Sequence, residues 1–285
     1  MRGNKQIVGA YKLIKTKKPS NSLSKKNVVN TKLKIACVLP DVHIPYQDKA
    51  SLKLAEAIMN YVKPDQIVQV GDLVDFYPVS RYTKDPDRAS GVHLQKELDE
   101  ASSIIHKWAE LAPVTILSGN HEARLDKYLV EKAPGLKGLR SLNVQSLLGV
   151  DDKKVSYKEF MYLGRLFISH GDRVSKGGCA HSAMTAKSNI EKMNCDVMLG
   201  HIHRLGAFYR KTRGGGDQAG FEIGCLCERE TVEYLPEPNW QHGMAVVHYR
   251  NDGNKDYNAQ LIHIKSHGKT GNKRRAIYDG KIFEC

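Results

Sequence analysis

Short apolar runs recur along the centre of the chain, and amphipathic stretches separate several of them. Apolar residues at helical spacing predict one helix that Asp48 can cap and that ends before Pro64, and a second helix over about residues 94–111. Each apolar run has four or five residues and predicts a buried strand; the runs are residues 35–39, 67–70, 114–117, 166–169 and 196–199. Strands that alternate with helices indicate an α/β fold.

The pattern changes after residue 203, where shorter segments are separated by turn residues. The run Gly214-Gly215-Gly216-Asp217 predicts a turn. We expect the segments around it to form antiparallel strands of a second sheet. Cys225 and Cys227 alternate in this region, so they would share one face of a strand.

Polar motifs follow the predicted strands, and every motif contains side chains that can bind a metal ion. Because open α/β sheets bind ligands at the carboxyl ends of their strands, we expect the motifs to meet at one sheet edge. A single motif of this kind occurs by chance in many proteins, whereas all of them in order predict a metal site. In chain order they are Asp41-Val42-His43, Gly71-Asp72-Leu73-Val74-Asp75, Gly119-Asn120-His121-Glu122, Ser169-His170-Gly171-Asp172 and Gly200-His201-Ile202-His203.

The residue types indicate which metals and which reaction to expect. Imidazoles mixed with carboxylates suit manganese, iron, zinc or nickel better than calcium or magnesium, and manganese is the ion that we expect. Two divalent cations about 3.5–4 Å apart can clamp the attacking and leaving oxygens of a phosphoryl displacement. Ions held so close together call for a bridging carboxylate. The motifs therefore favour a two-metal phosphoesterase.

The motifs resemble those of the calcineurin-like metallophosphoesterase superfamily, which read D-x-H, G-D-x-x-D, G-N-H-D/E, a lone His and G-H-x-H. The resemblance covers roughly the central two-thirds of the chain. It implies a four-layer αββα sandwich, in which helices flank two mixed β-sheets, for a domain over residues 33–265. The later segment Asn239-Trp240-Gln241-His242-Gly243 also resembles phage-encoded members of the superfamily.

The resemblance also implies a role for each motif residue. His121 would donate a proton to the leaving oxygen, and Asp75 would hold the His121 ring in the right tautomer. Apart from the resemblance, Arg124 follows the third motif closely and would contact a phosphate oxygen, and Asp172 would orient His170. The implied metal ligands fall into two sets that share Asp72 as the bridge: Asp41, His43 and His203 for one ion, and Asn120, His170 and His201 for the other.

Two departures from the family pattern bear on the substrate. Protein Ser/Thr phosphatases of the superfamily typically carry Arg where Phe76 stands, and they usually lack a counterpart of His203. Both differences favour a nucleic-acid or nucleotide phosphodiester as the substrate. The alternative enzyme is a phosphomonoesterase that acts on nucleotides or phosphoproteins. The alternative that is not an enzyme is a nucleic-acid-binding accessory protein whose metal site is structural.

Aromatic and basic residues follow Asp75 in a predicted loop beside the metals. Aromatic faces can stack on bases while cations hold phosphates. Alternatively, Phe76 and Tyr77 pack beneath the loop, because both uses bury an aromatic face. The residues of this loop are Phe76, Tyr77, Arg81, Tyr82, Lys84 and Arg88.

Positive charge gathers at the two ends of the chain. The formal net charge is +13, and the first 40 residues contain ten Lys and Arg but no Asp or Glu. A segment with few large apolar groups cannot offset its ordering entropy by burial, so we expect residues 1–32 to form a flexible basic arm. The arm would either contact the backbone of DNA or RNA or serve as a solubilising tail. Residues 266–285, with Lys269, Lys273, Arg274 and Arg275, form a second basic segment.

Neither membrane insertion nor secretion is expected. No apolar run is long enough to cross a bilayer, and the basic N-terminus lacks the apolar stretch of a signal peptide. The six cysteines include no C-x-x-C pair, which predicts reduced cysteines that pack in the core. The sequence therefore predicts a cytoplasmic phosphoesterase with no membrane partner.

Overall fold

The structure of the chain is a computed structural model that describes residues 32–81, 93–150, 154–173, 181–228, 239–268 and 273–285. Leu33–Cys285 form one compact unit. The predicted basic arm lies outside the described residues except for Lys32. The predicted loop residues Tyr82, Lys84 and Arg88, and the basic residue Lys269, also lie outside them.

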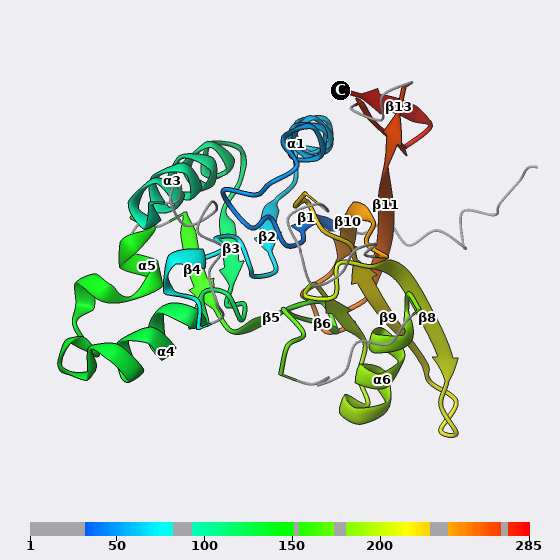
Figure 1. Cartoon of the computed structure of the whole chain (residues 1–285). Helices are drawn as coiled ribbons and strands as arrows, with labels where there is room; N and C mark the ends of the chain where they lie inside the picture. Colours follow the sequence, from blue (N-terminus) through cyan, green and yellow to red (C-terminus); the bar gives the residue numbers. More distant parts are fainter. Residues whose placement is uncertain (1–31, 82–92, 151–153, 174–180, 229–238, 269–272) are drawn as a thin grey trace, which may run out of the picture. The chain divides into compact units, whose positions relative to one another are not determined.

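Helices and strands alternate in the first half of the described chain (Figure 1). The α-helices are α1 (Lys49–Val62), α3 (Leu94–Leu111), α4 (Ala123–Lys132), α5 (Val144–Leu147) and α6 (Met184–Met193). Short 3-10 helices cover Tyr77–Val79, Pro134–Leu136 and Arg140–Leu142. Within the described residues, none of the helices has both the length and the apolar character needed to span a membrane.

The strands form two mixed sheets. The larger sheet has the order β13-β12-β11-β10-β1-β2-β3-β4, and the smaller has the order β5-β6-β7-β9-β8. Strands β1 to β4 run parallel to one another, as do β6, β7 and β9, while the remaining pairings are antiparallel. The strand bounds are β1 Lys34–Leu39, β2 Gln66–Gln69, β3 Val114–Leu117, β4 Val155–Lys158, β5 Phe160–Leu163, β6 Leu166–Ser169, β7 Val197–Leu199, β8 Leu205–Lys211, β9 Asp217–Ile223, β10 His242–Tyr249, β11 Tyr257–His267, β12 Lys273–Tyr278 and β13 Lys281–Glu284.

Alternate residues of each strand face different layers, because successive side chains of a strand point to opposite sides of its sheet. In β1, Cys37 and Leu39 pack in a buried cluster with α1 and α3. Ala36 and Val38 pack in a second cluster with residues of the smaller sheet. Helix α6 covers the outer face of that sheet through Ile190. The layers are therefore helix, sheet, sheet and helix, which confirms the predicted αββα sandwich.

The local predictions agree closely with the structure. Helix α3 covers the predicted residues, and β3 and β6 match their predicted strands. Asp48 is the N-cap of α1, since its Oδ1 accepts a hydrogen bond of 2.7 Å from the Ser51 amide. These elements depend on apolar spacing within a few residues, which the sequence shows directly.

The division of strands between the sheets differs from the prediction. The second sheet already begins with β5, and β10 to β13 return to the first sheet. Strands β10 to β13 join the larger sheet through the antiparallel pairing of β10 with β1, in which Lys34 lies opposite Tyr249. Cys225 and Cys227 form isolated bridges instead of a strand, although both are buried in one small cluster with Trp240.

The C-terminal residues extend the larger sheet. The predicted boundary at residue 265 falls inside β11, and residues 273–284 form the hairpin of β12 and β13 at the edge of that sheet (Figure 1). Arg274 anchors this hairpin to the start of α1: its guanidinium pairs with the Asp48 carboxylate, and its Nε donates to the Ser51 hydroxyl over 3.2 Å. The basic residue Arg274 is therefore part of the fold.

We predict that Arg274→Ala lowers the free energy of unfolding by about 3 kcal/mol, because it leaves a largely buried carboxylate without its partner. Urea denaturation measures the effect. Arg275→Ala is the matched control. Its pair with Glu284 is 37% exposed on both sides, so its loss should cost less than about 1 kcal/mol. Equal losses for both variants would contradict the anchoring role of Arg274.

Candidate metal centre

The predicted ligands meet where the two sheets face each other. Asp41, Asp72 and Asn120 follow the parallel strands β1, β2 and β3 of the larger sheet, whereas His170 and His201 follow β6 and β7 of the smaller one. Hydrogen bonds join these loops: the amides of Val42 and His43 donate to the Asp72 carbonyl, and the His201 amide donates to Asp41 Oδ2 over 2.7 Å. The site is therefore built from the carboxyl edges of both sheets.

The first predicted ligand set is brought together. His203 Nε2 lies 3.1 Å from Asp41 Oδ2 and 3.2 Å from His43 Nε2. His43 Nε2 lies 3.8 Å from Asp72 Oδ2. Asp41 and Asp72 are almost fully buried. These ligand atoms thus converge on one small volume.

The second predicted set converges next to the first. His170 Nε2 lies 2.9 Å from Asn120 Oδ1 and 3.1 Å from Asp72 Oδ2. Ligand atoms of Asp72, His170 and His201 all lie within 4.8 Å of one another. The same carboxylate, that of Asp72, borders both sets, which is the position that a bridging ligand requires.

The hydrogen bonds behind the rings leave the inward nitrogens free to coordinate. His43 Nδ1 donates to Asp75 Oδ2 over 3.0 Å, and His170 Nδ1 donates to the Val70 carbonyl over 3.1 Å. In a neutral ring the other nitrogen, Nε2, then carries a lone pair. His43 Nε2 faces His203 Nε2, and the buried Asp41 Oδ1 nearby lacks a hydrogen-bond donor, an arrangement that suits a cation between them. The residues present therefore fit divalent metals.

His121, Asp75 and Arg124 lie together beside the ligands. His121 Nδ1 donates to the Asp75 carbonyl over 3.0 Å and lies 3.2 Å from its carboxylate. Arg124 Nη2 lies 2.9 Å from His121 Nε2, and Arg124 Nη1 lies 3.1 Å from Asp75 Oδ1. Asp75 thus contacts the predicted metal ligand His43 as well as the predicted proton donor His121, a second contact that the motif did not suggest.

The buried carboxylates favour positive charge at the site. Burial alone would raise the pKa of Asp75, but its hydrogen bonds with His121 and His43 hold that pKa well below the usual range. Burial alone would lower the pKa of His170, but the Asp72 and Asp41 carboxylates raise it to about 10. The same negative charge on the carboxylates would stabilise a divalent cation bound among these oxygens.

Several predicted ligands have a strained backbone. The φ angles of these residues are positive, a backbone conformation that residues other than Gly rarely adopt. They are 53° at His43, 51° at Asp72, 68° at His201 and 56° at His203. Each such residue costs on the order of 1–3 kcal/mol and persists only where its surroundings hold it in place. Such strain is typical of functional sites.

Glu122 holds two of the ligand loops together, a role that the sequence interpretation missed. Its Oε2 accepts hydrogen bonds of 2.9 Å from the amides of Asp72 and Gly119, and its Oε1 accepts bonds of 2.8 and 3.2 Å from Leu73 and Val74. A Cβ at Gly119 would collide with the Asp72 carboxylate, so only Gly permits this approach. The acidic end of the third motif was the signal that could have revealed Glu122.

Other predicted details change in the structure. Asp172 was expected to orient His170, but in the structure the His170 ring donates its Nδ1 hydrogen bond to the Val70 carbonyl. Phe76 is fully buried in the core beside α3, so it packs beneath the loop and cannot stack on a base. Cys227 Sγ lies 3.8 Å from His203 Nδ1 behind the first ligand set, a contact for which the sequence contained no signal.

Comparison with known families identifies the class of the protein. The family model of the calcineurin-like phosphoesterases matches residues 36–223, which include every predicted ligand. The chain belongs to this family. Family membership supports phosphoester hydrolysis with divalent metals, in agreement with the clusters of possible metal ligands in the structure.

The chain is also similar to phage proteins and, more distantly, to two solved structures. The chain is 29% identical to the Gene 54 proteins of Mycobacterium phages L5 and D29 over 221 residues, which cover 74% of this chain and 87% of each relative. Vacuolar Protein Sorting 29 from Cryptosporidium parvum is 13% identical with a TM-score of 0.43, covering 89% of this chain and 96% of the other. The Pseudomonas putida nuclease MPE is 14% identical with a TM-score of 0.35, covering 74% and 83%. The phage relatives confirm the resemblance to phage-encoded members.

We predict that Glu122→Gln lowers the free energy of unfolding by about 3 kcal/mol, because the new amide group faces backbone donors that lose their acceptor. Manganese affinity should fall by about 10- to 100-fold, as expected when the support of a ligand is removed. Urea denaturation and titration calorimetry measure the two effects. Asp126→Asn, on the exposed side of α4, is the control and should change neither. Unaltered stability and metal affinity in Glu122→Gln would refute this role.

Proposed function

We propose that the protein hydrolyses a phosphodiester of a nucleic acid or nucleotide with the help of two bound divalent ions. We expect both ions to be manganese. The observation that carries this proposal is the pair of ligand sets bordering one carboxylate, Asp72, beside the His121–Asp75 pair. The free cysteines of the described chain are compatible with a cytoplasmic location for the enzyme.

We propose a separate set of ligands for each ion. Asp41, His43 and His203 would hold one, Asn120, His170 and His201 the other, and Asp72 would bridge them. When bound, such a pair activates a water and neutralises charge on the phosphate. Imidazole and carboxylate donors in this proportion suit manganese, iron, zinc or nickel.

The remaining residues would handle the leaving group. His121 would give its Nε2 proton to the leaving oxygen, while the Asp75 carboxylate stabilises the charged ring through Nδ1. In the structure Arg124 Nη2 lies against that same Nε2. For His121 to act, the guanidinium must turn away, and a phosphate oxygen of the substrate would draw it. Arg124 would thus bind phosphate and release His121 in one movement.

The position after Asp75 supports a phosphodiester over a phosphoprotein. Protein phosphatases of the superfamily typically place an Arg there, whereas the Phe76 side chain is fully buried and its amide donates to Glu97 over 3.1 Å. His203 would complete the first ligand set, and protein phosphatases of the superfamily usually lack its counterpart. The arm adds cationic charge that suits a polyanionic substrate.

We predict that His121→Ala lowers kcat for bis(p-nitrophenyl) phosphate by about 100- to 10,000-fold, because the leaving oxygen loses its proton donor. Manganese affinity and thermal stability should stay close to those of the wild type. Asp72→Asn should instead weaken manganese binding and abolish turnover. Steady-state kinetics after EDTA treatment and manganese addition, with calorimetry, measure these effects.

His106→Ala is the control for this experiment, because His106 lies on the exposed side of α3. Full turnover by His121→Ala would eliminate its catalytic role. A wild type that binds manganese but cleaves no diester, monoester, cyclic nucleotide or DNA would instead indicate an accessory protein. Preference for monoesters in the same substrate screen would indicate the phosphomonoesterase.

We also propose that the basic arm recruits DNA or RNA. Deleting residues 1–30 should weaken binding of a nucleic acid and flatten its salt dependence, because fewer counterions are released. The kcat for the aryl diester should not change. Fluorescence anisotropy over a range of salt concentrations measures this. Equal affinity with and without the arm would leave only a solubilising tail.

A further inference from the structure

A cleft lies at the edge of the sandwich away from the metal centre. It has a volume of about 550 Å³ and is lined by residues of β8, β9 and β11 together with Arg165. Arg165 precedes β6, whereas His170 follows the same strand. Arg165 and His170 flank the four residues of β6 and are five residues apart, so they are separated by roughly 17 Å at ~3.3 Å per residue. The cleft is therefore a separate feature of the fold.

Three aromatic rings form the wall of the cleft. Tyr209 and Phe221 pack edge to face with centroids 6.0 Å apart, and Phe221 and Tyr257 do so at 6.4 Å. Phe221 is buried, but Tyr209 is 67% exposed. An exposed ring beside two packed ones offers a face on which a flat ligand can stack.

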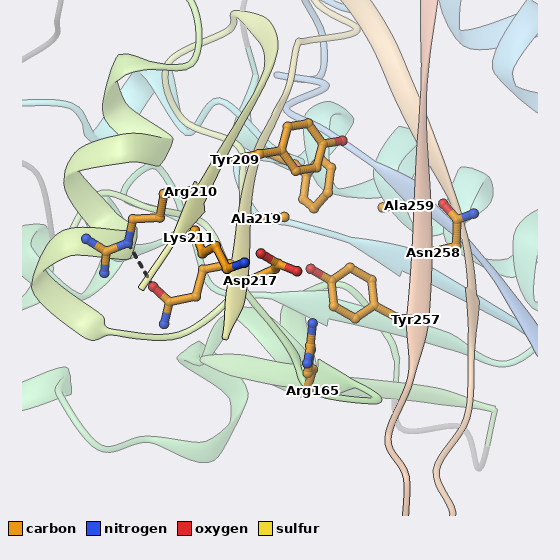
Figure 2. A pocket seen from close by; sticks show the side chains of 11 residues that line it. Arg165, Tyr209, Arg210, Lys211, Asp217, Ala219, Tyr257, Asn258 and Ala259 are labelled. Atoms are coloured by element: carbon orange, nitrogen blue, oxygen red, sulfur yellow. Dashed lines mark hydrogen bonds between the residues drawn. The ribbon is translucent and has the colours of Figure 1, made fainter. Parts of the chain in front are cut away.

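Charged groups surround these rings. Figure 2 shows Lys211, Asp217, Tyr257 and Arg165 pointing toward one another, while Arg210 points away from them. The Arg165 guanidinium lies 5.8 Å from the centre of the Tyr257 ring, and its Nε is 2.7 Å from Asp196. Within the described part of the chain, Lys211 and Asp217 have no ion-pair partner within 4 Å. The cleft thus combines stacking surfaces with cations and one carboxylate acceptor.

We propose that this cleft binds a single strand of nucleic acid, with a base stacked on Tyr209 and its phosphates near Lys211 and Arg165. Each nucleotide of such a strand supplies a flat ring and a phosphate, the groups that aromatic and cationic side chains hold in single-strand binding. Asp217 accepts a hydrogen bond from the amino group of a base such as cytosine. The cleft volume lies within the range of ordinary ligand sites.

The inference rests on the proposed function in one respect, because the bound strand would be the substrate of the metal centre. A strand of about ten nucleotides extends ~34 Å at ~3.4 Å per nucleotide, enough to reach from the cleft to the ligands. The cleft would hold the strand while a phosphodiester further along it is cleaved. Long strands would therefore bind more tightly than dinucleotides.

Fluorescence anisotropy tests the cleft with the full chain, a labelled oligodeoxycytidylate of about ten nucleotides, and EDTA to prevent cleavage. Tyr209→Ala should weaken binding by at least about five-fold, because a stacked base contributes on the order of 1–3 kcal/mol. Lys211→Gln should also weaken binding, because it removes a cation beside the phosphates. Tyr209→Phe keeps the ring and should stay within about two-fold of the wild type. Tyr162→Ala, which removes a tyrosine that is 52% exposed on β5, should have no effect.

Unchanged affinity in both cleft variants, an equal loss in Tyr162→Ala, or no oligonucleotide binding by the wild type would overturn the proposal. Turnover of bis(p-nitrophenyl) phosphate with manganese, measured for the same variants, separates it from the proposed function. Normal turnover with unchanged oligonucleotide affinity would refute the cleft alone. Loss of oligonucleotide affinity in the variants of a protein that cleaves no phosphate ester would refute the catalytic function alone.

Discussion

The metal centre depends on the buried carboxylate of Glu122, which accepts four backbone hydrogen bonds from the loops after β2 and β3. Those loops carry Asp72 and Asn120, and Asp72 borders both ligand sets. Acidic side chains held this close repel one another and lose their hydration, so the loops need strong internal bonds. Charge-assisted bonds to backbone amides provide them without adding another cation to the site. The strained backbone at Asp72 persists for the same reason.

A second carboxylate, that of Asp75, joins a predicted metal ligand to the proposed proton donor. It contacts His43 on one side and His121 on the other, and Arg124 lies against it. A change at Asp75 would therefore affect both a ligand and the proposed proton donor. Effects of substitutions at such shared positions do not add. The proposed roles of His121 and Arg124 are also coupled, since Arg124 Nη2 lies against His121 Nε2, the nitrogen that would donate the proton.

The sandwich separates two kinds of surface at opposite ends of its strands. The carboxyl ends of parallel strands gather the polar ligands, as in other open α/β folds. At the other end, strands β8, β9 and β11 line a cleft in which Tyr209 stays exposed. The protein would thus hold a long substrate at one edge and cleave it at the other. That division would let binding strength vary without altering the geometry of the reaction.

The sequence by itself determined the central strands, α3 and the five motifs, because apolar spacing and motif order depend on neighbouring residues. It also implied both ligand sets, and the structure brings their members together. Only the tertiary structure decided which sheet each strand joins, since β1 pairs with β10 across most of the chain. It likewise buried Phe76, revealed the contact of Asp75 with His43, and formed the cleft beside Tyr209. These features arise from contacts between distant residues, whose geometry no local pattern contains.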